Sequence, residues 1–291
     1  MDATAKLGRP GNMATATIDT TRRRRRPNWL ADHTAAELIR LRRPAFVRGG
    51  FGIIAGFTAL ISIFVFTTAG DDEGGFGPAA SAAADELSEV GGFVSSLGTI
   101  SNLVGIVFLA LWAMAAATDY DSGLVRILAQ AEPRRGRLLA GKVGALALFT
   151  VAGTLLATVV AAAVAYPLAG ITDVSSAAWG TNWIGEFLSA WLYLTVASLA
   201  WGAVGLAIAV GTRSSGVAIA AGIGYLMVVE NLLRIVAEDI VDYFPGSTLT
   251  AVASGGSDAL SAGAAMALAV GYIALALLVA HVTFGRREIT S

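Results

Sequence analysis

Residues 143–166 read VGALALFTVAGTLLATVVAAAVAY and contain no charged side chain. About 20 apolar residues in an α-helix are long enough to cross the hydrocarbon core of a bilayer. A transmembrane β-strand needs only about ten residues and alternates apolar with polar positions. This stretch therefore predicts a membrane-spanning helix and argues against a membrane β-barrel.

Five further stretches fit the same pattern, so the sequence predicts an all-α, polytopic membrane protein with six spans. The composition agrees, because 55% of the 291 residues are hydrophobic and the mean hydropathy is +0.68. Only 14% are charged, against about 25% in a typical soluble domain. The start of the second span is the least sharply bounded, because FVSSLG at 93–98 also suits a loop. Within a transmembrane domain at 49–287, the predicted spans are residues 49–69, 93–117, 143–166, 187–210, 217–236 and 263–284.

The distribution of charge predicts the orientation of these spans. The net charge is only −1, yet 19 of the 20 lysines and arginines lie before span one, between spans two and three, or after spans four and six. The connections at 70–92, 167–186 and 237–262 contain no Lys or Arg and hold 12 acidic residues. Because basic residues are retained on the cytoplasmic side of short loops, we expect both termini in the cytoplasm. We also expect the chain to lie in the plasma membrane. The first 48 residues lack the apolar core of a cleavable signal, so span one is expected to be an uncleaved anchor.

The residue types needed for common catalytic and metal sites are scarce. The chain has no cysteine and only two histidines, His33 and His281, which excludes thiolate metal sites and leaves little for histidine chemistry. The stretch GRLLAGK at 136–142 resembles a phosphate-binding loop but is followed by Val143, where the loop needs Ser or Thr. We therefore predict a non-catalytic subunit without a metal, cofactor or nucleotide site of its own.

The segment before span one divides into a tail and a short helix. Residues 1–31 include five consecutive arginines and too few apolar residues for a core, so we expect a disordered tail that contacts anionic lipid rather than nucleic acid. Residues 32–48 are predicted to form an amphipathic elbow helix at the membrane surface, with Thr34 and Glu37 as a capping box. Leu38 and Leu41 would share its apolar face, and Pro44 would end it.

The connection at 118–142 is the longest polar segment on the predicted cytoplasmic side. Asp119, Asp121 or Ser122 can cap a helix there. Its apolar residues Leu124, Ile127 and Leu128 are predicted to share one face, and Pro133 to end it. A connection with this much structure is predicted to be a docking surface.

This connection resembles the cytoplasmic loop of type-two ABC transporter permeases, which combines an acidic start, Gly-x-x-Arg-x-Leu, Pro-x-x-Arg and a final Gly-Lys. The six spans and the elbow helix extend the resemblance over most of the chain, although many of these permeases have glutamate where this chain has Asp119 and Asp121. The candidate residues for coupling to an ATPase are Asp121, Gly123, Arg126, Leu128, Glu132, Pro133, Arg135, Arg137, Gly141 and Lys142.

The resemblance implies a permease of an ABC exporter that pairs with a second copy of itself, as a homodimer, within the lipid bilayer. Each copy would bind a separate cytosolic ATPase, which would hold the ATP and magnesium. The loop at 118–142 would be the coupling helix, with Gly123 allowing a tight turn into it. Arg126, Arg135 and Arg137 would contact acidic groups of the ATPase or lipid phosphates, or serve only as positive flanks of the spans.

The predicted membrane interior is poor in polar groups. Glu230 and Arg234 lie four residues apart in span five and can neutralise each other, either on a substrate path or as a structural pair, which we favour. Residues 237–262 are predicted to form a re-entrant segment, and Asn102 and Asn231 to join helices by hydrogen bonds. Small residues at 52 and 56, and at 216, 220 and 224, predict close helix contacts. A secondary transporter or channel is the alternative function, but it would be expected to place more ionisable residues at mid-membrane.

Overall fold

The computed structural model describes residues 28–69, 84–132, 134–172, 174–180 and 182–286. Most of the predicted disordered tail at 1–31 lies outside these residues. The described part of the chain is helical and contains no β-strand. The predicted all-α fold is therefore confirmed.

Six helical segments are long and apolar enough to cross a membrane, as predicted. The fifth is formed by three consecutive elements, α8, the π-helical turn η2 and α9. The second begins at Gly92, so the polar start of this span is helical, and Ser96 and Ser101 donate hydrogen bonds to carbonyl groups of their own helix. The segments are α2 (Pro44–Thr67), α4 (Gly92–Asp121), α6 (Arg135–Ala169), α7 (Trp183–Thr212), α8 (Ser215–Gly224) with η2 (Tyr225–Val229) and α9 (Glu230–Val236), and α12 (Ala262–Arg286).

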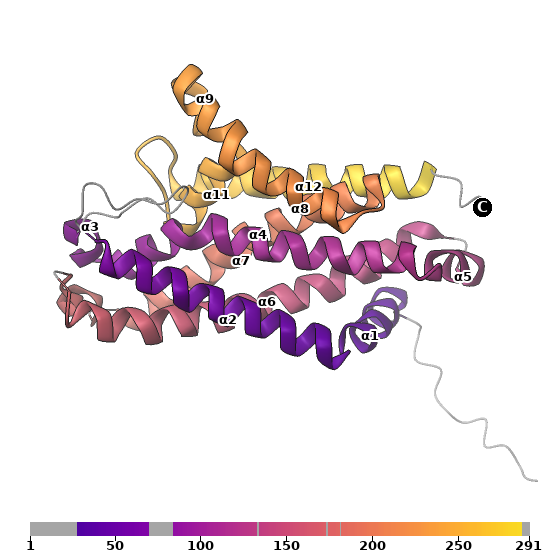
Figure 1. Ribbon diagram of the computed structural model, residues 1–291, viewed down its shortest axis with the longest axis horizontal. Coiled ribbons are helices and arrows are strands. Elements are labelled where there is room, and N and C mark those ends of the chain that lie inside the picture. Colours follow the sequence, from indigo (N-terminus) through magenta and orange to yellow (C-terminus); the bar gives the residue numbers. More distant parts are fainter. Residues whose placement is uncertain (1–27, 70–83, 133, 173, 181, 287–291) are drawn as a thin grey trace, which may run out of the picture.

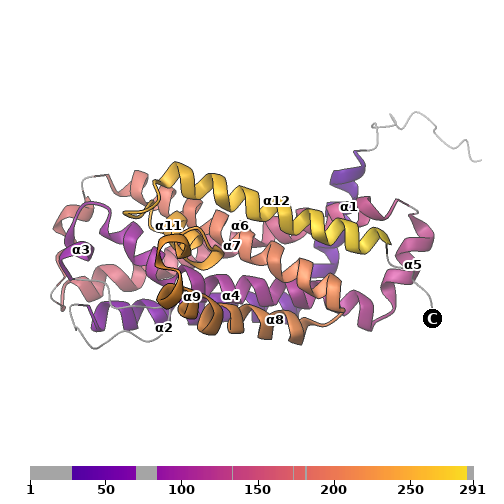
Figure 2. The same cartoon turned by 90° about the horizontal axis from the view of Figure 1, so that it is seen from above.

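Shorter helices lie at the two ends of the bundle (Figures 1 and 2). The end with α1, α5 and the first turns of α6 is called the basic end below, and the end with α3 and η1 is called the acidic end. The remaining short helices, α10 and α11, follow the fifth span within the predicted re-entrant segment. These elements are α1 (Trp29–Leu41), α3 (Ala84–Ser88), α5 (Leu124–Ala131), η1 (Ser176–Gly180), α10 (Glu238–Val241) and α11 (Pro245–Ala253).

The elbow helix begins and ends earlier than the predicted 32–48, and residues 44–48 belong to α2. Helix α1 starts at Trp29 after Asn28, so Thr34 lies inside the helix and the predicted capping box with Glu37 is wrong. The reason is geometric, since a capping hydroxyl serves only the free N–H groups of a first turn. Helix α1 ends at Leu41, and Pro44 begins α2, where its missing N–H is tolerated.

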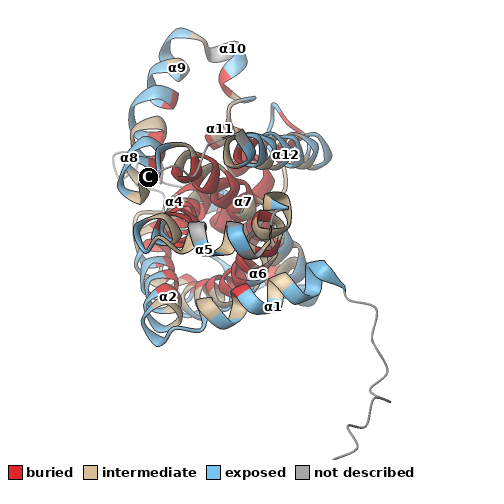
Figure 3. Cartoon of the chain, turned by 90° about the vertical axis from the view of Figure 1, so that its right-hand side faces the viewer, coloured by how far each residue is buried: buried red, intermediate tan, exposed pale blue. Residues whose placement is uncertain are grey.

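The centre of the bundle is the crossing of α4 and α7, where buried residues gather in Figure 3. A Cβ atom on Gly105 would overlap the indole of Trp201, and one on Gly202 would lie 2.7 Å from the Trp112 ring. A Cβ on Gly205 would overlap the backbone carbonyl of Leu109. Glycine at these positions thus allows the two helices to pack at close range.

The small residues predicted to mediate close contacts do not do so within the described chain. A Cβ atom on Gly52, Gly56 or Gly224 would meet no atom within 4 Å, and one on Gly216 would meet only Ser214, at 3.8 Å. Fourfold spacing places these residues on one helix face but does not determine which face another helix covers. These glycines therefore make no close contact within one chain, and close packing across a dimer stays a prediction.

Hydrogen bonds between helices fix α11 inside the bundle. The Asn102 amide of α4 donates to Thr250 Oγ1 of α11 at 2.8 Å and accepts from the Trp201 indole N–H of α7 at 3.3 Å. The prediction that Asn102 joins helices is confirmed. Asn231 instead donates to the carbonyls of Leu226 and Met227 in its own span, next to the π-helical turn, so that prediction is wrong.

Candidate functional site

Helix α5 lies across the basic end of the bundle and connects α4 to α6 (Figures 1 and 3). Gly123 precedes it with φ of 67°, in the left-handed region that glycine adopts without strain. The predicted tight turn at Gly123 is therefore confirmed. The prediction that Asp119, Asp121 or Ser122 caps this helix is wrong, because α4 continues to Asp121 and Ser122 Oγ donates to the Thr118 carbonyl of α4.

Among the α5 side chains that the structure describes, one large apolar side chain is directed outward. Leu124 and Leu128 are half-buried toward the bundle, whereas Ile127 is 64% exposed. The three positions lie on one side of the helix, as predicted, but only Leu124 and Leu128 are covered by the bundle. Leu124 and Leu128, one turn apart, face the bundle, whereas Ile127 lies at the edge of this side and is left uncovered.

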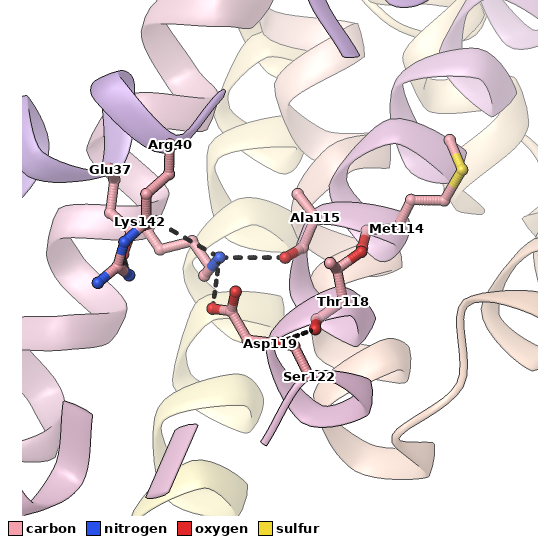
Figure 4. Close-up of polar contacts among 8 residues, drawn as sticks. All are labelled: Glu37, Arg40, Met114, Ala115, Thr118, Asp119, Ser122 and Lys142. Carbon is pink, nitrogen blue, oxygen red and sulfur yellow. Dashed lines mark hydrogen bonds and ion pairs between the residues drawn. The ribbon is translucent and has the colours of Figure 1, made fainter. Parts of the chain in front are cut away.

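Lys142 binds two carboxylates from other helices, as Figure 4 shows. Its Nζ atom lies 2.8 Å from Asp119 Oδ2 of α4 and 3.6 Å from Glu37 Oε2 of α1, and it donates to the Ala115 carbonyl at 3.1 Å. Glu37 also accepts a 2.6 Å hydrogen bond from Arg40. The side chains of Lys142, Asp119 and Glu37 are only 13, 14 and 10% exposed. We call Lys142, Asp119, Glu37 and Arg40 the ion cluster; it joins α1, α4 and α6.

Glycines on α6 bring α1 against the ion cluster. A Cβ on Gly141 would lie 2.6 Å from His33 Cβ and 3.0 Å from the His33 carbonyl carbon. A Cβ on Gly144 would lie 2.7 Å from Thr34 Oγ1. Gly141, a predicted site residue, thus has a structural reason to be glycine, because it allows α1 to cross α6 at backbone distance.

A second polar contact holds the start of α1 near α6. Glu132 Oε2 lies 3.6 Å from Arg137 Nη1 and 3.7 Å from His33 Nε2, and the Arg137 guanidinium stacks 5.4 Å from the centre of the Trp29 ring. The backbone N–H of Arg134 donates to Glu132 and, with Arg137 nearby, lowers the pKa of its carboxyl. Because the folded pKa is lowered, this contact stabilises the folded chain above the ordinary carboxyl pKa and is lost as the pH falls through the lowered value.

The remaining predicted coupling residues take different positions. Asp121 is exposed at the end of α4, and Arg135 reaches the Gly285 carbonyl of α12 at 3.5 Å. The side chain of Arg126 and the whole of Pro133 lie outside the described residues. The stretch at 136–142 is helical from its first residue and does not form a phosphate-binding loop.

Glu230 and Arg234 do not form the predicted ion pair with each other. The Glu230 carboxylate is buried and accepts hydrogen bonds from the backbone N–H of Gly246, at 2.9 Å, and from the N–H and hydroxyl of Ser247. Arg234 is exposed and donates to Ser247 Oγ at 3.2 Å. Unpaired N–H groups at the start of a helix attract a carboxylate, so the first turn of α11 takes the place of Arg234 as the partner of Glu230.

Replacing Glu230 by glutamine is expected to lower the free energy of unfolding by about 1–2 kcal/mol, because the charged acceptor of three hydrogen bonds becomes neutral. The change can be measured by thermal unfolding in detergent. Arg234→Gln, which alters an exposed group, is the control and should have a smaller effect. Equal losses from the two variants would contradict this assignment.

The residues of the ion cluster belong to different predicted features of the sequence. Glu37 is a predicted elbow residue, Asp119 a variant position of the loop motif and Lys142 the last motif residue, and no sequence pattern brings them together. The Ala115 carbonyl, which completes the Lys142 site, gives no sequence signal at all.

Comparison with protein-family models and with curated proteins finds no match for the chain.

Proposed function

We propose that the chain is the transmembrane permease subunit of an ATP-binding cassette exporter in the plasma membrane. In this proposal both termini are cytoplasmic, two copies form the translocation pathway, and a separate cytosolic ATPase docks on α5 of each copy. ATP and magnesium are bound by that ATPase. This chain contributes binding and movement and carries out no chemical step.

The observation that supports this proposal best is the placement of α5. A short helix held across the end of a bundle, with Ile127 directed outward, is a suitable insert for a cleft in a partner. Burying one isoleucine side chain contributes about 1.5–3 kcal/mol to binding. Arg134, three residues after the end of α5, is exposed and can pair with acidic groups at the rim of such a cleft.

The connections of α5 provide a route for force into the membrane. Helix α6 has 35 residues and is therefore about 52 Å long, well beyond the roughly 30 Å hydrocarbon core. Its first turns, with Lys142, can thus project from the membrane and meet α5. A displacement of α5 would move α4 through the turn at Gly123. Because the ion cluster joins α4 to α6 and α1, these helices would move with α4.

Replacing Ile127 by glutamate is expected to weaken binding of the ATPase at least tenfold, because a carboxylate would be placed in an apolar contact. The chain should be co-expressed with an ABC ATPase, sought first in an adjacent reading frame that encodes a complete phosphate-binding loop, and the co-purified ATPase and its ATP hydrolysis measured. Ile171→Glu is the matched control, since Ile171 is also exposed, at 79%, but follows α6 at the acidic end.

The proposal predicts that Ile171→Glu retains the ATPase. Full retention by Ile127→Glu would contradict docking on α5. Purification of the native chain as a monomer without any ATPase, with transport driven by an ion gradient, would favour a secondary transporter.

A further inference from the structure

A groove of about 370 Å³ runs between the α1–α2 connection and the last turns of α4. It is separate from the outward face of α5. One wall comes from the start of α2, the other from the end of α4, and α1 closes its polar end. The residues that line it change character along its length.

The polar end of the groove contains one more basic than acidic side chain, and the other end is apolar. Arg40 and Arg43 lie at the first, and Phe46, Ile53 and Leu111 line the second. Ile53 is nine residues after Pro44, the start of α2, and Leu111 is ten before Asp121, the end of α4. At 1.5 Å per residue the groove reaches about 14 Å along both helices, roughly half of a 30 Å hydrocarbon core.

One cation of the groove remains available for a ligand. The lining contains three basic and two acidic side chains, and Lys142 and Arg40 pair with Asp119 and Glu37 in the ion cluster. Arg43 is exposed and makes no ion pair with the described residues. Arg40 uses one N–H group on Glu37 and, with five donors on a guanidinium, can offer others.

We propose that this groove binds one anionic phospholipid from the membrane leaflet at the basic end. The phosphate lies against Arg43 and Arg40, and one acyl chain lies between α2 and α4. The arginines at the polar end of the groove, its apolar lining and its length of about one leaflet fit a lipid. A free phosphate would use only the arginines. This lipid site does not depend on the proposed ATPase. A bound lipid would make the positions of α1 and α2 depend on the lipid composition of the membrane.

Native mass spectrometry of the purified full chain in detergent tests the site, with palmitoyl-oleoyl phosphatidylglycerol and the corresponding phosphatidylcholine as probes. We expect one phosphatidylglycerol to bind more tightly than phosphatidylcholine. Arg43→Gln should reduce this preference about fivefold, as expected for one arginine near a lipid phosphate. Equal binding of the two lipids to the native chain would overturn the proposal.

Filling the groove provides a second test that does not alter charge. A Cβ on Gly49, which lines the groove, would meet no atom within 4 Å, so Gly49→Leu can fold and still occupy the acyl position. Gly52→Leu is the matched control, because Gly52 is equally open and lies outside the lining. Gly49→Leu should weaken phosphatidylglycerol binding about tenfold and Gly52→Leu should leave it unchanged. Unchanged binding to Gly49→Leu, or complete displacement of the lipid by inorganic phosphate, would contradict the proposal.

Discussion

Replacing Lys142 by methionine is expected to lower the free energy of unfolding by about 2–3 kcal/mol. The variant removes the cation between Asp119 and Glu37, which are only 14 and 10% exposed. Removing one partner of a buried pair leaves an uncompensated charge and costs about 3–5 kcal/mol, and partial exposure of this cluster reduces that cost. Because the cluster joins three helices, the loss should appear in thermal unfolding and as greater protease sensitivity of α1.

A double-mutant cycle tests whether this loss comes from the ion pair. Asp119→Asn removes the carboxylate that lies 2.8 Å from Lys142. The combination with Lys142→Met should be less destabilising than the sum of the two single changes, because the unpaired charge at position 119 is no longer present. Strictly additive effects would show that Lys142 acts through other contacts.

Replacing Gly205 by alanine is expected to cost about 1–3 kcal/mol or more, the range for overpacked cores. The new methyl group would overlap the backbone carbonyl of Leu109 on α4. No rotamer change can move a backbone oxygen, so α4 and α7 would have to separate. The expected result is a lower unfolding temperature in detergent.

Gly211→Ala, on the same helix, is the matched control for Gly205→Ala. A Cβ on Gly211 would meet no atom within 4 Å. Alanine there should stabilise the helix by about 0.5–1 kcal/mol, because glycine is the poorer helix former. If both variants changed stability in the same direction, the close crossing at Gly205 would not be the cause.

The six spans could be predicted because each depends on its own composition. A long apolar run that crosses a membrane must pair its backbone polar groups with each other, which a helix does. The structure of 143–166 can therefore be predicted without knowledge of its neighbours. The polar start of the second span was less clear from the sequence. Its serines are compatible with a helix because their hydroxyls bond to carbonyls one turn back.

Contacts between segments could not be predicted in the same way. Glu37, Asp119 and Lys142 are far apart in the sequence, and only packing of α1 across α6 brings them together. Spacing placed Glu230 and Arg234 on one helix face, yet the first turn of α11 offered Glu230 better donors. The glycines of the α4–α7 crossing are distributed over two helices and form no single pattern, whereas the regular spacing at 52 and 56 faces open space.

The same limit applies to the coupling site. The sequence indicates a short amphipathic helix at 124–131, and the turn at Gly123 follows from glycine alone. Which side of that helix faces outward depends on the packing of Leu124 and Leu128 against the bundle. Periodicity therefore identified the apolar side of the helix, but not that the bundle leaves Ile127, on which the proposed docking depends most, exposed.

Cross-linking from position 127 tests most directly whether α5 contacts a cytosolic ATPase. The native chain contains no cysteine, so Ile127→Cys introduces the only thiol, and Ile171→Cys provides the equivalent at the acidic end. In intact cells, the first variant should cross-link to an ABC ATPase and resist a membrane-impermeant maleimide, whereas the second should be labelled from outside. Labelling of Ile127→Cys from outside the cell, with no ATPase adduct, would contradict both the orientation and the docking.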